Sequence, residues 1–247
     1  TEVFAEANTD LDVIAIAPSV GGINGAGTSV KLNSNVAVNT NVYNANISAE
    51  EITVNATTTP KLYALATADV IGGAAVGLTL SEVKIEDDVT VNIGDGVVLN
   101  ADDTIDILAE FKNPEAGYNA YVEAIAGSGG VITGAVTSTK INLHTNTLTQ
   151  LGKNIQINGN TVDVKAVHKD TNNYYNLSAE ASGASGKGSE SFTTVESDVD
   201  LSIDDGTTIT SSETTVIRAE NKTIKDWLNA KEDSSVGYKD YNSLSAG

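Results

Sequence analysis

The chain contains one short pattern four times, a segment in which apolar and polar residues alternate. Its copies are "AEEITVNAT", "DDTIDILAE", "GNTVDVKAV" and "SETTVIRAE". Aligning them places Ile52, Ile105, Val162 and Val216 in register, at nearly equal intervals. Alternation with period two predicts half-buried β-strands. A nearly constant interval predicts a stacked array of similar units.

Three other marks keep almost the same interval. They are the glycine pairs Gly21-Gly22, Gly72-Gly73 and Gly129-Gly130, the tyrosines Tyr63, Tyr121, Tyr175 and Tyr241, and the prolines Pro60 and Pro114. We therefore predict one solenoid segment over residues 1–247 with about four repeats of roughly 54 residues. The expected boundaries lie near 1–60, 61–117, 118–173 and 174–240.

Composition favours strands over helices. Hydrophobic residues make up 40% of the 247 residues, which is enough for a core, and the 22 glycines with few aromatics suit tight turns. A β-propeller is an alternative, but the turns lack blade-specific aromatic marks. We predict an all-β fold, a right-handed parallel β-helix. We expect two to three coils of roughly 20 residues per unit and an axis on the order of 60 Å.

The repeat resembles that of a known family. Elements such as "INLHTN" and "VNIGDGVVLNADDTIDILA", which follow "ALATADVIGGAAVGLTL", are similar to the repeats of filamentous haemagglutinin-type adhesins secreted by two-partner (type V) systems, particularly the leukotoxin-like branch. The resemblance implies a secreted β-helical stalk segment on a bacterial cell surface, with attachment as its function. It implies a host-cell surface protein or glycan, or a neighbouring filament, as partner. Nothing resembles the family's amino-terminal secretion domain.

Charge narrows the range of partners. Asp and Glu number 33 against 14 Lys and Arg, which gives a formal net charge of −19. Such a surface repels nucleic acid and anionic lipid headgroups, so we expect neither as a partner. The apolar runs are too short to cross a membrane. The absence of Cys excludes disulfides and thiolate metal sites. The absence of Met, even at position 1, predicts a processed product or an excised fragment.

The alternative function is a carbohydrate-active β-helix enzyme, of the polysaccharide lyase or phage-spike type. It would typically need acids that hold Ca²⁺ and a basic residue that abstracts a proton. The single arginine, Arg218, lies inside an alternating segment, and the acidic pairs Asp87-Asp88, Asp102-Asp103 and Asp204-Asp205 fall between strands. We expect these acids to be solvated turn residues, with Ca²⁺ binding as the alternative. An enzyme should show clustered acids, bases and aromatics, whereas a stalk should show ladders of Thr, Asn and Asp.

The two histidines do not suggest a metal site. The interval between His144 and His168 is close to one expected coil, so the two could lie one coil apart on one flank. Without Cys, a zinc site would have to recruit carboxylates, so we expect surface histidines. The segment "SGASGKGS" (182–189) is interpreted as a degraded glycine turn, because Gly188 replaces the Ser or Thr of a phosphate loop. We predict no catalytic residue, no metal and no cofactor.

The last repeat carries an insertion, in the stretch "NKTIKDWLNAKEDSSVG". Thr223, followed by Asp226 in the next turn, is typical of a helix start, so we expect a short helical insertion near 223–232. Its apolar face includes Trp227 and Leu228. These two residues either fix the inserted loop against the flank of the solenoid or bind a host partner or neighbouring filament.

Overall fold

The computed structural model describes residues 1–225 and 238–246, and these residues form strands, turns and irregular segments but no helix. The described strands join into one sheet in which every paired strand runs parallel to its neighbour. They are β1 (Glu2–Ser34), β2 (Ala37–Val42), β3 (Asn46–Ala49), β4 (Ile52–Ile85), β5 (Asp88–Ile93), β6 (Val98–Ala101), β7 (Thr104–Phe111), β8 (Ala120–Leu151), β9 (Gln156–Ile203), β10 (Thr208–Lys225) and β11 (Tyr238–Ala246). The predicted all-β parallel β-helix is confirmed.

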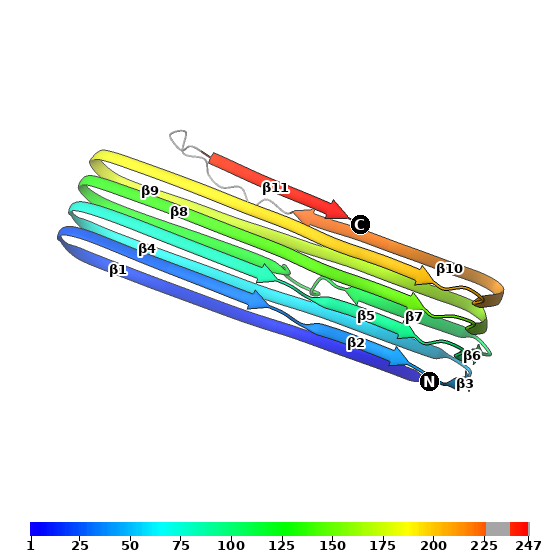
Figure 1. The fold of residues 1–247 in the computed structure, drawn as a ribbon. Coiled ribbons are helices and arrows are strands. Elements are labelled where there is room, and N and C mark those ends of the chain that lie inside the picture. The colour runs from blue at the N-terminus through cyan, green and yellow to red at the C-terminus, as the bar shows by residue number, and fades with distance from the viewer. Residues whose placement is uncertain (226–237, 247) are drawn as a thin grey trace.

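Each repeat forms one coil. Glu2 pairs with Thr53, Tyr63 with Tyr121, and Tyr121 with Asn173, so the chain returns beside itself once in every repeat. Successive coils lie side by side up the stack (Figure 1). The prediction of two to three coils per repeat is therefore wrong.

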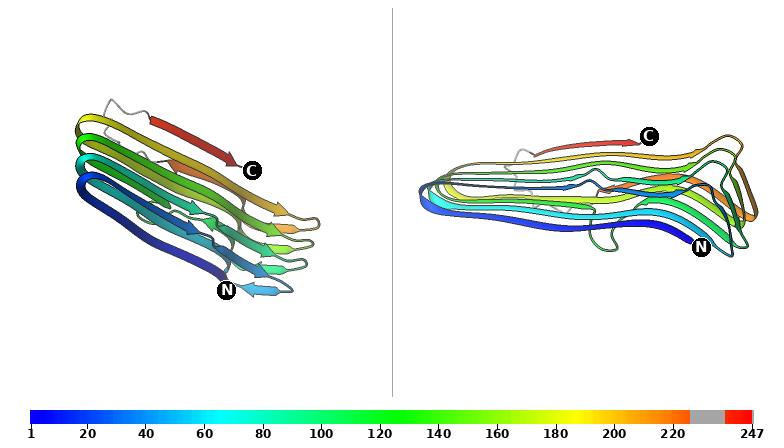
Figure 2. Two further views of the ribbon diagram at one scale, coloured as in Figure 1. Left: turned by 60° about the vertical axis from the view of Figure 1, so that its left-hand side comes forward. Right: turned by 60° about the horizontal axis from the view of Figure 1, so that its bottom comes forward.

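The coils are flat because each one is built from two long layers. β1, β4, β8 and β9 each run outward, bend at one narrow end and return in the second layer (Figures 1 and 2). A layer of roughly 20 residues at about 3.3 Å per residue is on the order of 65 Å long. A stack of about five strands at about 4.8 Å is only on the order of 20 Å high. The expectation of a long stacking axis is wrong, since the long dimension follows the strands.

Alternation along the strands creates the core between the two layers. In β7 every second residue, from Ile105 to Phe111, is buried. Parallel pairing stacks these inward residues into columns that cross all the coils. Two such columns are Val3, Val54, Ile107, Val164 and Ile217, and Ala5, Ala56, Ala109, Ala166 and Ala219. These two columns keep a similar residue size from coil to coil.

The predicted glycine pairs lie at the narrow bend, where backbones of successive coils approach closely. A Cβ on Gly73 would meet the carbonyl oxygen of Gly22 at 2.9 Å, and a Cβ on Gly130 would overlap that of Gly72. A Cβ on Gly77 would lie 3.2 Å from the carbonyl oxygen of Gly127. Figure 2 shows that the coils are thin at this bend and broader at the opposite end. Only small residues fit inside the thin end.

The predicted register holds for three of the four repeats. Ile52 pairs with Ile105, and Ile105 with Val162, as expected. Val162 pairs with Thr215 instead of Val216, because an irregularity between Ser211 and Thr214 shifts the register. The tyrosine interval likewise fails in the third coil, since Tyr121 pairs with Asn173.

The predicted helix start at Thr223 is wrong. Thr223 and Ile224 belong to β10 and pair with Asp170 and Thr171 of β9. The Thr223 hydroxyl donates to Asp170 Oδ1 at 2.7 Å, so a partner in the neighbouring coil replaces the local helix signal. The rest of the expected 223–232 insertion, with Trp227 and Leu228, lies outside the described residues.

Substituting one inward and one outward neighbour in β7 tests the layer assignment. Ile107→Ala should lower the free energy of unfolding by about 2–5 kcal/mol, because it leaves a cavity in a buried column. Leu108→Ala, on the outward face, should cost less than half as much. Urea titration measures both. Equal losses at the two positions would contradict the assignment.

Candidate functional site

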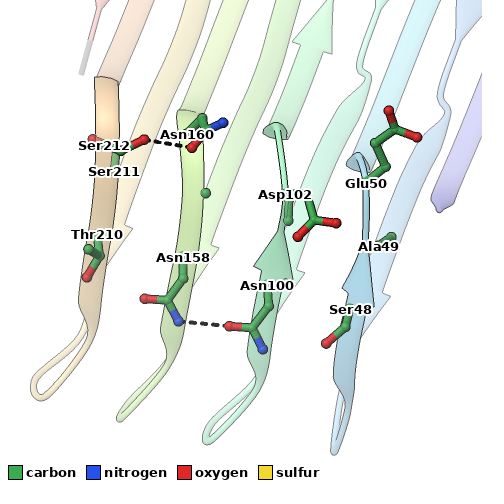
Figure 3. A pocket seen from close by; sticks show the side chains of 12 residues that line it. Ser48, Ala49, Glu50, Asn100, Asp102, Asn158, Asn160, Thr210, Ser211 and Ser212 are labelled. Atoms are coloured by element: carbon green, nitrogen blue, oxygen red, sulfur yellow. Dashed lines mark hydrogen bonds between the residues drawn. The ribbon is translucent and has the colours of Figure 1, made fainter.

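A groove of about 710 Å³ runs along the outer surface where β3, β6, β9 and β10 lie side by side (Figure 3). Its lining comes from four successive coils and is polar apart from two alanines and a glycine. The lining residues are Ser48, Ala49, Glu50, Asn100, Ala101, Asp102, Asn158, Gly159, Asn160, Thr210, Ser211 and Ser212.

The groove is built on ladders of equivalent residues. Ser48, Asn100, Asn158 and Thr210 occupy one register position in four coils. Asn158 Nδ2 donates to Asn100 Oδ1 at 2.9 Å, and Ser212 Oγ donates to Asn160 Oδ1 at 2.6 Å (Figure 3). These inter-coil bonds hold the amides at a fixed orientation, about one coil spacing of 4.8 Å apart.

A left-handed residue in each coil turns the chain toward the groove. Asn44, Gly96, Asn154 and Gly206 have φ of 50°, 70°, 55° and 79°. Asn and Gly are the residues that adopt this conformation most readily. Their recurrence once in every repeat is a sequence signal for the corner that the strand patterns alone did not reveal.

The groove offers amide and hydroxyl groups together with the carboxylates of Glu50 and Asp102. Such a set donates to and accepts from neutral polar ligands rich in hydroxyl groups. The carboxylates disfavour anionic ligands such as nucleic acid. The chemistry therefore fits binding of a polyhydroxylated ligand.

A second outward feature is a ladder of tyrosines. The rings of Tyr63 and Tyr121 stack with centroids 5.2 Å apart, and Tyr118 lies 5.6 Å from Tyr121. Tyr63 Oη donates to Glu123 Oε2 at 2.9 Å. Burial, together with the negative charge of Glu123, raises the pKa of Tyr121 to about 12. The stacked rings cover one another's faces, so this ladder ties coils together.

Ion pairs also cross the coils. Glu82 lies between Lys31 and Lys140, at 3.0 Å and 3.4 Å, on adjacent coils. Burial alone would raise the pKa of Glu82, but the two ammonium groups outweigh it and lower that pKa. Alternating the sign of charge up the stack avoids the repulsion that identical neighbours would create.

The expectation that the acidic pairs are solvated is wrong for one member. Asp87 is fully buried and accepts hydrogen bonds from Ser34 Oγ at 2.8 Å, the Val36 backbone at 3.1 Å and Thr58 Oγ1 at 3.4 Å. Burial raises its pKa, although these donors oppose the shift. Asp102 and Asp103 are exposed, as expected.

The two histidines do not share a flank. His144 is exposed, as expected, with Nδ1 lying 3.1 Å from Glu196 Oε2. His168 points inward and is fully buried, so the expectation of a surface histidine is wrong there. Its ring stacks on Phe111 of the previous coil with centroids 4.6 Å apart.

His168 belongs to a buried polar cluster. Its Nε2 lies 2.8 Å from Asp170 Oδ1, and its Nδ1 lies 3.3 Å from Thr145 Oγ1. Asn172 also donates to Asp170. A hydroxyl, an imidazole and a carboxylate in sequence resemble the order of a hydrolytic triad. Here all three side chains are buried between the layers, where a substrate cannot reach them, so the cluster is not a candidate hydrolytic site.

Other candidates lie apart from the groove. Arg218 is on the outward face of β10 and is paired with Glu220 of the same strand.

Within residues 1–225 and 238–246, no group of three His, Asp or Glu side chains is placed to hold a metal ion. The same residues contain no helix that is long and apolar enough to cross a membrane.

Comparison with known proteins finds no matching protein-family model, no matching curated protein and no matching solved structure. The resemblance to filamentous adhesins therefore depends on the repeat itself.

The buried carboxylate of Asp87 predicts a pH effect on stability. Because its pKa is raised, the folded state holds the proton more tightly than the unfolded chain does. The stabilisation that the protonated carboxyl gives to the folded state is fully present below the ordinary pKa of about 3.9, and it is lost as pH rises through the raised pKa of the folded state. The wild type should therefore lose stability from pH 4 to pH 7 through this group, whereas Asp87→Asn should not. The free energy of unfolding of the variant minus that of the wild type, measured by urea unfolding at both pH values, should be larger at pH 7 than at pH 4.

Asp88→Asn is the matched control for that experiment, because it removes the neighbouring exposed carboxylate. Its stability relative to the wild type should change less over the same pH interval. An equal or larger change for Asp88→Asn would contradict the role of burial.

Proposed function

We propose that the chain is a structural and adhesive stalk segment of a large secreted bacterial surface protein, and that it mediates host-cell contact without catalysis. The observation that carries this proposal is the ladder of Ser48, Asn100, Asn158 and Thr210 in the outer groove. Each coil offers a polar side chain at the same position. Repeated weak contacts of this kind give avidity to an extended ligand.

The proposed ligand is a glycan on the host-cell surface. Amides and hydroxyls of the groove match the hydroxyl groups of a sugar chain, and their inter-coil hydrogen bonds reduce the entropy lost on binding. A host-cell surface protein or a neighbouring filament is the alternative partner.

The same groove favours a stalk over the enzyme alternative. Its lining combines two carboxylates with Ser, Thr and Asn, without a basic or aromatic side chain. A lyase needs a base beside its acids to abstract a proton. A groove lined by repeated polar side chains without such a base supports a surface that binds a ligand and does not cleave it.

Binding of the full 247-residue chain to host cells and to a glycan panel tests the proposal. Asn100→Ala combined with Asn158→Ala should weaken binding roughly tenfold, because each amide contributes about 0.5–1.5 kcal/mol. Asn142→Ala is the control, since Asn142 Nδ2 also bonds across coils, to Glu82 at 3.2 Å, away from the groove. Unchanged binding by the double variant, or cleavage of a uronate polymer, would overturn the proposal.

Trp227 and Leu228 remain the proposed second contact with a host partner or neighbouring filament. Trp227→Ala should lower cell binding and leave thermal stability unchanged if Trp227 contacts the partner. Lower stability with unchanged binding would assign it to fixing the inserted loop instead.

A further inference from the structure

Both ends of the coil stack present strands with one unpaired edge. Among the described strands, β1 pairs only with β4 and β10 pairs only with β9. The core columns are open there as well. Leu11 and Val13 of β1 are 42% and 40% exposed, and Ile217 of β10 is 49% exposed. An exposed edge of this length is a template for pairing with another chain.

We propose that a second copy of this chain stacks on the first head to tail, with β1 of one copy adding in parallel to β10 of the other. The inward columns carry this inference. One column ends with Ile217 and begins with Val3, and the other ends with Ala219 and begins with Ala5. Placing Val3 on Ile217 puts Ala5 on Ala219. Both columns then continue with residues of the size that they already contain.

Polar positions continue in the same register. Thr223 points inward, because its hydroxyl bonds to the buried Asp170. The residue that would lie on it is Thr9, an inward position of β1 that is half-buried. Hydroxyl pairs between coils already occur inside this fold, as between Thr137 and Ser189 at 2.8 Å. The junction therefore repeats a contact that the stack uses elsewhere.

Both signs of charge occur on the outward faces of this pair of strands. The outward face of β10 carries Arg218 and Lys222 on either side of Glu220, whereas that of β1 carries Glu2 and Glu6. In the proposed register Glu6 lies opposite Glu220, and this like-charge pair is unfavourable on its own. Arg218 and Lys222 offset it from the diagonal positions that long side chains reach. Phe4 lies opposite Arg218, which allows a cation–π contact.

The contact joins different surfaces of the two copies. Such a heterologous contact leaves one free end of each kind, so it extends into a filament and does not close on itself. The inference concerns the chain of residues 1–247 and requires no host ligand. Further repeats of a longer protein would continue the same columns from the same two edges.

Two variants block one end each. Val3→Asp places a charge on the open column of β1, and Ile217→Lys places one on that of β10. Sedimentation of the full chain over a range of concentrations should show association for the wild type and at least a tenfold weaker association for each variant alone. Mixing the two variants should restore dimers, because each supplies the intact end that the other lacks.

Val76→Lys is the matched control. Val76 is exposed at the narrow bend, and its strand is paired on both edges, with Gly25 and Gly134. This variant should associate like the wild type. A monomeric wild type at every concentration, loss of association in Val76→Lys, or a mixture that stays monomeric would overturn the proposal. So would unchanged association of either end variant.

Thiol cross-linking keeps the test decisive if an end variant fails to fold. The chain has no Cys, so Phe4→Cys and Arg218→Cys introduce single exposed thiols at positions that the register places opposite each other. Mild oxidation of the mixture should give mainly the mixed disulfide. A statistical mixture, in which the mixed dimer makes up only about half of the cross-linked product, would contradict head-to-tail stacking.

Discussion

In-register backbone pairing between successive coils is the constraint on which the rest of this structure depends. It places each paired residue beside the equivalent residue of the next coil. The side chains at one position of successive coils must therefore be compatible in size and charge. The column from Ala5 to Ala219 satisfies this with one small residue. Lys31, Glu82 and Lys140 satisfy it by alternating the sign of charge.

The same constraint produces the proposed function. Polar side chains that point inward bond to one another between coils, as Thr223 and Asp170 do. A ladder that faces outward repeats one chemistry along the surface, as the amides of Asn100 and Asn158 do. The two proposals, recognition of an extended ligand and self-association at the ends, both use this repetition of one chemistry from coil to coil.

Local alternation made the strands and three repeat registers predictable, since Ile52, Ile105 and Val162 point inward at matching positions. The coil size was not predictable in this way. Period-two alternation does not reveal that β4 passes through the bend at Gly72-Gly73 without ending. Burial of Asp87 and His168 was missed because their partners, Ser34 and Thr145, are supplied by distant parts of the chain. The groove was missed because its residues meet only when coils stack.

The length of a single coil tests the account most directly. Spin labels on Ile71→Cys and Asp95→Cys, both on exposed side chains, report the distance from the narrow bend to the opposite end of one coil. The two positions are 24 residues apart in a mostly extended segment. At about 3.3 Å per residue, double electron–electron resonance should therefore give a distance of roughly 60 Å or more. A main distance below about 30 Å would match compact coils of about 20 residues and would contradict the flat, one-coil repeat.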